Sequence, residues 1–325
     1  MVTLGIDLGG TGIKAGVVDE DGHLIVKDRC PTRPERGHEA VIWDMAALSR
    51  RVVEAAGLKM GDISGVGVGI PGVEDAARGI VPFCTNLGWH EVPLTAMLGG
   101  LLGLPVKVGN DATVAALAEA VAGVSRMTRS SVLVTLGTGV GGGVILDGRP
   151  FVGAHGVATE IGHLIVKFDG VMCTCGNRGC WERYASASAL IREGRAAAEA
   201  NPAGGIALAC GGQPDMISAK LVIDVARGGD PDAMRIFEDY VFWVTVGLAN
   251  LINIYDPEVI ALGGGVSAAG TFLLDAVRKK LPELVFFKAM PYARVELAVL
   301  GNDAGIIGAA MLSRIHANPA AAGFA

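Results

Sequence analysis

Two stretches of this sequence follow the same plan, and they constrain the fold more than any other feature. Residues 2–27 and 132–152 each contain an apolar run, a Gly-Thr-Gly turn, a second apolar run, an Asp-Gly turn and a third run. Short β-rich runs joined by glycine turns are typical of antiparallel strands. A plan that returns after about 130 residues indicates two related α/β domains.

The first turn of each copy is a candidate phosphate site. The turns Gly9–Gly12 and Gly137–Gly139 let backbone N–H groups approach an anion closely, and Thr11 and Thr138 add hydroxyl donors. Asp7 ends the first strand, where it could hold a metal ion or its water. A single turn of this kind is equally compatible with an ordinary hairpin. The repeat favours a nucleoside triphosphate bound between two domains.

Composition and charge exclude several classes of protein. The net charge is −6 and no basic cluster occurs, so nucleic-acid binding has little electrostatic support. The longest apolar stretch, Val241–Ile254, is too short to span a bilayer and predicts a buried helix. The chain begins with a strand-like segment rather than a signal peptide, and three of its six cysteines are clustered. We therefore expect a cytoplasmic protein that does not bind membranes.

Four residues in one short segment have the spacing of a metal site. His163 is followed by Cys173, Cys175 and Cys180, and three thiolates with one imidazole are a typical tetrahedral zinc set. Buried cysteines without a metal are the less favoured interpretation. Because all four ligands come from the protein, the zinc is expected to be structural. Glu160 and Glu182 flank the set and are free for another ligand.

Three further segments allow more than one interpretation. Asn110 and Asp111 lie between a predicted strand, 105–110, and a predicted helix, 112–122. Taken alone, Asp111 is more easily explained as a helix cap than as a catalytic carboxylate at the sheet edge. Residues 79–90 and 201–213 predict loops. The glycines at 263–265 favour a turn beneath a nucleobase or ribose over a dinucleotide fold.

Taken together, the motifs resemble one family across nearly the whole chain. They are DLGGT at 7–11, Asn-Asp at 110–111, LGTGVGGG at 136–143, EIGH at 160–163, CTCGNRGCWE at 173–182 and GGGVS at 263–267. In this order they resemble the ROK family of bacterial sugar kinases and sugar-responsive repressors, and they are most similar to its glucokinases.

The resemblance implies a fold and a domain division. It implies the actin-like ATPase fold, an α/β architecture of two ribonuclease-H-like domains with a cleft between them. We expect a small N-terminal domain of residues 1–112, completed by a C-terminal helix at about 303–318. Residues 113–302 would form a larger domain that carries the zinc loop.

The resemblance also implies roles for individual residues. Asp111 would be the general base that takes the proton of the sugar's primary hydroxyl. The sugar ligands would be Gly72, Asn86, Asn110, Asp111, Glu160, His163 and Glu182. ATP and Mg²⁺ would be held by Asp7, Gly9, Gly10, Thr11, Lys14, Gly137, Thr138, Gly139, Gly264 and Gly265. Many members carry Glu before the Asn-Asp pair, whereas this chain has Gly109.

Two functions follow from the family. The favoured one is an ATP-dependent hexose kinase that phosphorylates the 6-hydroxyl, most simply of glucose. N-acetylglucosamine, N-acetylmannosamine, mannose and fructose are alternative substrates. The other function is a sugar-responsive repressor, which in this family has an added N-terminal helix-turn-helix domain. The position of DLGGT near residue 1 and the acidic charge favour the kinase. A homo-oligomer, a dimer or tetramer, is expected.

Overall fold

The structure is a computed structural model that describes residues 1–317, and the chain packs into two compact units. The first unit contains Met1–Leu133, Gly143–Thr159 and the chain from Val299 onward. The second contains Val134–Gly142 and Glu160–Ala298. The division expected at residue 112 stays a prediction. The end of the expected C-terminal helix, residue 318, lies outside the described residues.

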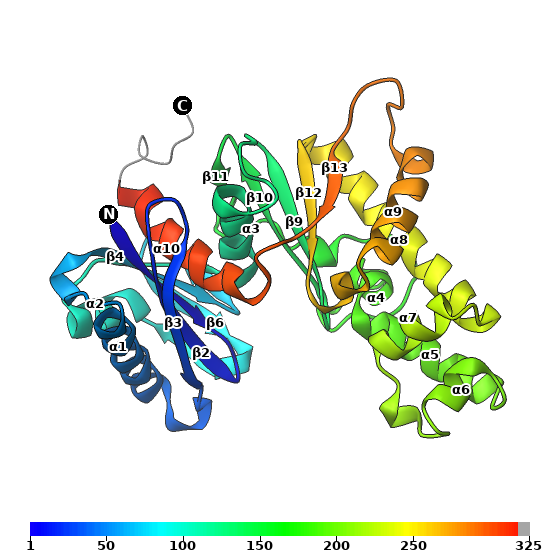
Figure 1. Ribbon diagram of the computed structural model, residues 1–325, viewed down its shortest axis with the longest axis horizontal. Helices are drawn as coiled ribbons and strands as arrows, with labels where there is room; N and C mark the ends of the chain where they lie inside the picture. Colours follow the sequence, from blue (N-terminus) through cyan, green and yellow to red (C-terminus); the bar gives the residue numbers. More distant parts are fainter. Residues whose placement is uncertain (318–325) are drawn as a thin grey trace. The chain divides into compact units, whose positions relative to one another are not determined.

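The elements of the two units are shown in Figure 1. The first unit contains β1 (Val2–Leu8), β2 (Gly12–Val18), β3 (Leu24–Pro31), β4 (Ile63–Ile70), β5 (Val73–Asp75), β6 (Ile80–Cys84), β7 (Trp89–Val92), β8 (Val106–Asn110), β11 (Arg149–Pro150), α1 (His38–Ala55), α2 (Leu94–Leu102), α3 (Asp111–Ala122) and α10 (Ala304–Ala317). The second contains α4 (Glu182–Ala185), α5 (Ala187–Ala200), α6 (Gly205–Ala209), α7 (Ala219–Arg227), α8 (Pro231–Tyr255), α9 (Thr271–Leu284), β12 (Val259–Gly263) and β13 (Arg294–Leu297). Strands β9 (Ser131–Leu136) and β10 (Val140–Leu146) contribute residues to both units.

Two five-stranded sheets repeat one strand order. The first sheet runs β3-β2-β1-β4-β8 and the second runs β11-β10-β9-β12-β13. In each sheet the first three strands in chain order, β1–β3 or β9–β11, form the meander. The next strand, β4 or β12, pairs with the first of these, and β8 or β13 pairs with that strand. In the first sheet β1 pairs antiparallel with β2 and parallel with β4, and β4 pairs parallel with β8. The repeated plan that the sequence predicted is confirmed.

Helix α10 lies directly on one face of the first sheet because glycines remove the side chains there. A Cβ atom at Gly5 would lie 1.9 Å from the Ile306 carbonyl oxygen, and one at Gly67 would lie 1.7 Å from the Ala309 oxygen. Helix α10 also packs against α3. This close contact fixes α3 with respect to the sheet, and α3 begins at Asp111.

The opposite face of this sheet is covered by an apolar core. Leu4 and Ile6 are fully buried with Val41, Ile42 and Met45 of α1. Burying side chains of this size contributes about 1.5–3 kcal/mol each. The first sheet is therefore rigid on both faces, so residues at its strand ends are held in place.

The second unit is organised around α8, which includes the predicted buried helix Val241–Ile254. Asp230 caps the helix by accepting from the Ala233 amide at 2.9 Å, and Pro231 occupies its first turn. Gly247 gives room to the fully buried Trp181, whose indole would lie 1.9 Å from a Cβ there. Trp181 also donates to the Trp243 carbonyl at 2.7 Å. The segment that ends the cysteine cluster is thus anchored on α8.

Two loop predictions were wrong. Residues 79–90 lie largely in the small sheet β5-β6-β7, and residues 201–213 include α6. Helix α6 starts where the Gly205 amide donates to Asp230 at 3.0 Å. The strand pairing in the small sheet and the bond from Gly205 to Asp230 both involve residues apart in the sequence. Glycine content alone therefore did not reveal these elements.

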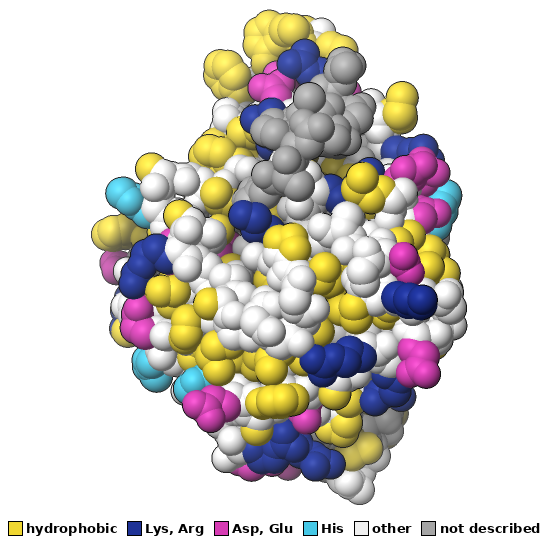
Figure 2. All heavy atoms as spheres, turned by 90° about the vertical axis from the view of Figure 1, so that its left-hand side faces the viewer, with side chains coloured by type: hydrophobic (Ala, Val, Ile, Leu, Met, Phe, Trp, Pro, Cys, Tyr) yellow, Lys and Arg dark blue, Asp and Glu magenta, His cyan; other side chains and the backbone are white. Residues whose placement is uncertain are grey.

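Within residues 1–317, no helix combines the length and the apolar character that crossing a membrane would need. Figure 2 shows Lys and Arg side chains interspersed with Asp and Glu on one face of the molecule. The described residues of that face therefore form no continuous basic stripe.

Candidate functional site

Asn110 and Asp111 have separate tasks at the end of β8. The Asn110 side-chain oxygen accepts from the amides of Ala112 at 2.9 Å and Thr113 at 3.2 Å, so Asn110 is the N-cap of α3. Asp111 is the first helical residue and is exposed. The interpretation of Asp111 as the N-cap is therefore wrong, because Asn110 holds that position, although the Ala112 amide also donates to Asp111 Oδ1 at 2.8 Å.

Gly72, between β4 and β5, and Cys84 of β6 lie next to this helix start. The Asn110 side-chain nitrogen donates to the Gly72 carbonyl at 3.4 Å. A Cβ at Gly72 would lie 2.9 Å from the Cβ of Cys84. Burial raises the pKa of the Cys84 thiol, and the negative charge of Asp111 adds to the rise. Gly72, Asn110 and Asp111 thus share one edge of the first sheet, at the carboxyl ends of β4 and β8.

The first glycine turn connects β1 to β2. The Gly9 amide donates to the Gly12 carbonyl at 2.9 Å. Thr32, at the end of β3, donates its hydroxyl to the Gly9 carbonyl at 2.7 Å and its amide to the Thr11 carbonyl at 3.1 Å. A Cβ at Gly10 would meet the Cβ of Asn86 at 3.5 Å. The turn is therefore held by the neighbouring strand and lies beside Asn86.

Asp7 and Lys14 form an ion pair beside this turn. The Lys14 amine lies 2.8 Å from Asp7 Oδ2, and both side chains are partly exposed. A Cβ at Gly305, in the first turn of α10, would lie 2.7 Å from Asp7 Cγ. A carboxylate and an ammonium group next to backbone amides provide ligands for both a cation and a phosphate.

The second glycine turn also contains an amide-to-carbonyl bond between glycines, but different residues support it. The Gly137 amide donates to the Gly139 carbonyl at 3.0 Å. The start of α5 holds the turn, because Ala187 donates its amide to the Gly137 carbonyl at 2.8 Å and Ser188 donates its hydroxyl to the Thr138 carbonyl at 2.7 Å.

Gly264 and Gly265 lie next to the strand that leads into this turn. Gly264 has φ +82, and a Cβ there would lie 2.6 Å from the Leu136 backbone nitrogen. Both glycines are exposed. A flat ligand group can approach the backbone closely here, because the backbone is exposed and the glycines carry no side chains.

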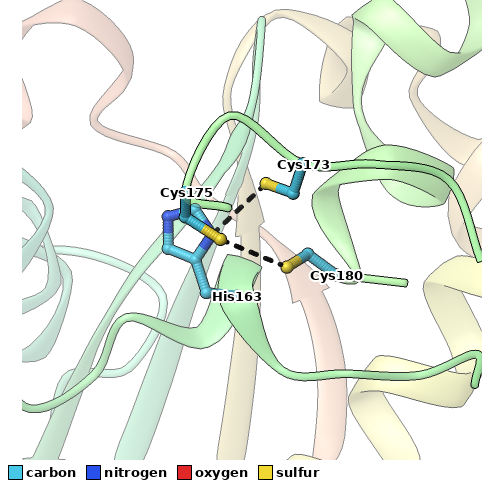
Figure 3. A group of neighbouring side chains, drawn as sticks. All are labelled: His163, Cys173, Cys175 and Cys180. Carbon is cyan, nitrogen blue, oxygen red and sulfur yellow. Dashed lines mark hydrogen bonds between the residues drawn. The ribbon is translucent and has the colours of Figure 1, made fainter. Parts of the chain in front are cut away.

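The four predicted metal ligands converge at one point (Figure 3). Their ligand atoms all lie within 4.8 Å of one another. Cys173 Sγ is 3.7 Å from His163 Nδ1, and Cys175 Sγ is 3.6 Å from Cys180 Sγ. Zn–S bonds of about 2.3 Å in a tetrahedron separate two sulfurs by about 3.8 Å. The donor set therefore fits a tetrahedral cation, with Nδ1 as the ligand nitrogen of His163.

The pKa values of the three thiols in this cluster are shifted in different directions. Burial, with the neighbouring Cys175 and Cys173, raises the pKa of the Cys180 thiol to about 12. Burial also raises the pKa of Cys173. The Asn177 backbone amide lowers the pKa of Cys175. Three thiolates this close together repel one another, so a cation is the natural partner of the ionised cluster.

The acidic residues at either end of the cluster have different surroundings. Glu160 is exposed and precedes the short 3₁₀ helix Ile161–His163, whose His163 amide donates to the Glu160 carbonyl at 3.0 Å. Glu182 is half-buried and lies 3.1 Å from Cys173 Sγ. A Cβ at Gly139 would lie 2.6 Å from Glu182 Oε2. Glu182 therefore adjoins both the metal cluster and the second glycine turn.

The predicted residues fall into two groups, one in each unit. The first unit holds Asp7, Gly9, Gly10, Thr11, Lys14, Gly72, Asn86, Asn110 and Asp111. The second holds Gly137, Thr138, Gly139, Glu160, His163, Cys173, Cys175, Cys180, Glu182, Gly264 and Gly265. Sequence reasoning missed Thr32 and Ser188, which support the turns, because no motif marks a hydroxyl whose partner is a distant carbonyl.

Gly109 has a packing explanation. A Cβ at this position would lie 2.9 Å from Leu312 Cδ2 of α10 and 3.2 Å from Val114 Cγ1 of α3. A larger side chain would need one of these helices to move. Close packing of α10 and α3 at the end of β8 thus leaves no room for a Glu side chain at position 109.

Comparison with known proteins gives matches over nearly the whole chain. A sequence profile described as the ROK family matches residues 3–315. A glucokinase of Streptomyces coelicolor is 40% identical over 317 residues, which cover 96% of this chain and 98% of that protein. A xylose repressor of Caldicellulosiruptor bescii is 28% identical, and the match covers 94% of this chain and 76% of that protein.

Solved structures give the same picture. The ROK glucokinase of Streptomyces griseus in complex with glucose and AMPPNP is 39% identical, with a TM-score of 0.79 and coverage of 97% of this chain and 99% of that one. The ROK hexokinase of Thermus thermophilus is 34% identical, with a TM-score of 0.84 and coverage of 98% and 99%. The expected actin-like ATPase fold is confirmed by these likenesses.

Proposed function

This chain belongs to the ROK family, and from this premise we propose that it transfers the γ-phosphoryl group of ATP to the 6-hydroxyl of glucose, giving glucose 6-phosphate and ADP. The observation that carries the proposal is the match to glucokinases of up to 40% identity over almost the full length of both chains. Streptomyces griseus glucokinase, a similar chain, was solved with glucose and an ATP analogue.

Asp111 is the proposed general base. It is exposed at the first position of α3, and the capping role is filled by Asn110. The carboxylate would accept the proton of the 6-hydroxyl as that oxygen attacks the γ-phosphorus. A well-placed base contributes about 10²–10⁴-fold to the rate.

The sugar hydroxyls are proposed to contact residues of both groups. They are Gly72, Asn86, Asn110, Glu160, His163 and Glu182. Amides and carboxylates can donate to and accept from adjacent hydroxyls, and a site that reads hydroxyls rejects analogues lacking them. With Nδ1 of His163 facing Cys173 at 3.7 Å, its Nε2 is the atom available to a sugar hydroxyl.

ATP and Mg²⁺ are proposed to use the two glycine turns. The backbone amides of Gly9–Thr11 and Gly137–Gly139 would hold phosphate oxygens, as phosphoryl transfer depends mainly on positioning and charge neutralisation. Asp7 would hold Mg²⁺ or its water, and Lys14, 2.8 Å away, would neutralise a phosphate. Gly264 and Gly265 would lie beneath the adenosine.

A structural Zn²⁺ is proposed for His163, Cys173, Cys175 and Cys180. Four protein donors at tetrahedral spacing leave no position for a catalytic water. When bound, zinc would supply only conformational stability, and the fold of the loop would set the position of Glu182.

The proposal is tested by measuring ADP release with a panel of hexoses and hexosamines. Glucose should give the highest kcat/KM among glucose, mannose, fructose, N-acetylglucosamine and N-acetylmannosamine. Asp111→Asn should lower kcat by about 10²-fold or more while glucose binding is retained. Asp21→Asn, an exposed carboxylate in the β2–β3 turn, is the control. ADP release that no sugar stimulates would refute the kinase.

Three further expectations accompany this proposal. A homo-oligomer, dimer or tetramer, is proposed and is tested by sedimentation velocity across protein concentrations. A sugar-responsive repressor is the alternative activity, and it predicts sugar binding without ADP release. The expected cytoplasmic location stays a prediction.

A further inference from the structure

A cavity of about 260 Å³ lies within the second unit. Its walls come from α4, from α5 and α8, which pack together (Figure 1), and from Lys167 and Val171 of the loop between His163 and Cys173. Of the described residues that line it, none is one that the sequence predicted to bind sugar, ATP or metal. The proposed kinase site therefore leaves this cavity unexplained.

Part of the cavity wall is aromatic and apolar. The ring centroids of Tyr184 and Trp243 lie 4.7 Å apart, and both side chains line the cavity with the buried Leu190 and Ile236. The Val171 amide donates to the Tyr184 hydroxyl oxygen at 2.7 Å, which holds that ring in place. The negative face of an aromatic ring attracts the polarised C–H bonds on the flat side of a sugar ring.

Charged side chains line the same cavity, with one positive charge in excess. They are Lys167, Arg192, Arg235, Glu193 and Asp239. Arg192 pairs with Glu193 at 2.8 Å, whereas in residues 1–317 no carboxylate pairs with Lys167 or Arg235. The Lys167 amine instead lies 5.8 Å from the centroids of both aromatic rings, which is within cation–π range. Two cations without a carboxylate partner favour an anionic ligand.

We propose that this cavity binds a phosphorylated monosaccharide. A phosphate monoester carries a charge of about −1.5 to −2 at pH 7, which Lys167 and Arg235 neutralise. Asp239 accepts from the sugar hydroxyls, and the rings of Tyr184 and Trp243 contact the sugar. Pockets for larger ligands measure about 300–1,000 Å³, so a cavity of about 260 Å³ suits a monosaccharide better than a nucleoside triphosphate.

Hexose 6-phosphate is the member of this class that the proposed reaction forms. Glucose 6-phosphate is therefore the probe, and this choice rests on the proposed kinase function. The cavity itself does not depend on that function, because its charges and rings would bind a sugar phosphate from any source.

Substitutions of the two unpaired cations test the site. Lys167→Met and Arg235→Gln each remove a positive charge and keep a long side chain. Both positions are exposed, so the fold should tolerate the changes. Lys279→Met and Arg294→Gln are the matched controls, because these residues are also exposed and belong to the same unit but do not line the cavity.

Binding is measured by calorimetric titration of the full chain at saturating glucose, which fills the proposed sugar site. We expect the wild type to bind glucose 6-phosphate at least about tenfold more tightly than inorganic phosphate, because the rings and Asp239 contact only the sugar. Lys167→Met and Arg235→Gln should each weaken this binding by about tenfold. The two controls should match the wild type.

The contrary results are distinct. No binding by the wild type, or wild-type affinity in both Lys167→Met and Arg235→Gln, would overturn the site. Equal affinity for glucose 6-phosphate and inorganic phosphate would overturn the sugar phosphate as its ligand. If circular dichroism shows that one variant does not fold, the other decides. Should no sugar stimulate ADP release, the proposed function fails, whereas the titration still confirms or refutes the cavity as a binding site.

Discussion

The two glycine turns are copies of one motif, yet different parts of the molecule hold them. Each contains one amide-to-carbonyl bond between glycines, from Gly9 to Gly12 and from Gly137 to Gly139. The first turn is held by Thr32, from the strand β3 of its own sheet. The second is held by the start of α5 and adjoins Glu182, which lies beside the cysteine cluster.

The two copies of the repeat therefore depend on different parts of the chain. The segment 160–188 connects the second sheet to α5 and contains the proposed metal ligands, Glu182 and Ser188. Loss of the metal should therefore disturb the second turn and Glu182 together. The first turn has no contact of this kind in its own unit and should be unaffected.

The largest expected effect comes from removing a metal ligand. Cys180→Ser should abolish metal binding and lower kcat/KM for glucose by about 10²-fold, because Glu182 and the second turn lose their support. Metal content by elemental analysis and initial rates check this. Cys210→Ser, a buried cysteine of the same unit outside the cluster, should behave like the wild type. A metal-free variant with full activity would contradict the scaffold role.

Alanine at one glycine of each turn, Gly10 and Gly139, separates the two turns. In Gly139→Ala the new Cβ would lie 2.6 Å from Glu182 Oε2, whereas in Gly10→Ala it would meet the Asn86 Cβ at an ordinary 3.5 Å. Gly139→Ala should raise KM for both glucose and ATP, with glucose KM higher by about tenfold. Gly10→Ala should affect only ATP. Equal increases in glucose KM in the two variants would contradict the proposed difference between the two turns.

Deleting one supporting hydroxyl should have a smaller effect. Ser188→Ala removes the 2.7 Å bond to the Thr138 carbonyl, and Thr32→Val removes the 2.7 Å bond to the Gly9 carbonyl. Each should cost about 1 kcal/mol of unfolding free energy, measured by urea denaturation. After metal removal the Ser188→Ala cost should shrink and the Thr32→Val cost should not. If both costs change alike, the two supports are not independent.

The smallest effect concerns the strand that holds the first turn. The Arg29 backbone amide and the Arg51 guanidinium, 2.6 Å from Asp28 Oδ2, lower the pKa of Asp28 on β3. Stability from a lowered carboxyl pKa is present above the unfolded pKa and is lost as pH falls through the folded one. Asp28→Asn should reduce stability at pH 7 by less than about 0.5 kcal/mol, since the pair is exposed. At pH values below the lowered pKa of Asp28 the two proteins should converge.

The sequence predicted the local features of this molecule well. The two meanders, the turn at Gly137–Gly139 and the cluster of one histidine and three cysteines depend on residues close together in the chain, so spacing reveals them. Helix α8 was predicted because Pro231 starts it and a long apolar run follows.

The sequence did not predict what depends on distant partners. Glu119, a buried carboxylate of α3, accepts from the amides of Val299 and Leu300, which are 180 and 181 residues away, so no local pattern marks it. The sequence also could not show that Asn110 rather than Asp111 is the N-cap of α3, since either residue type can cap a helix. The composition of residues 79–90 predicted a loop. Their strands form through pairing in the sheet β5-β6-β7, which composition does not reveal.

Hydrogen exchange of the two turns, measured with and without metal, tests the central claim most directly. The claim is that the metal-bound segment supports the second glycine turn but not the first. On chelation, exchange should increase at the amides of Gly137 and Ala187 and should stay unchanged at Gly9 and Thr32. Equal increases at both turns, or no increase at Gly137, would contradict the claim.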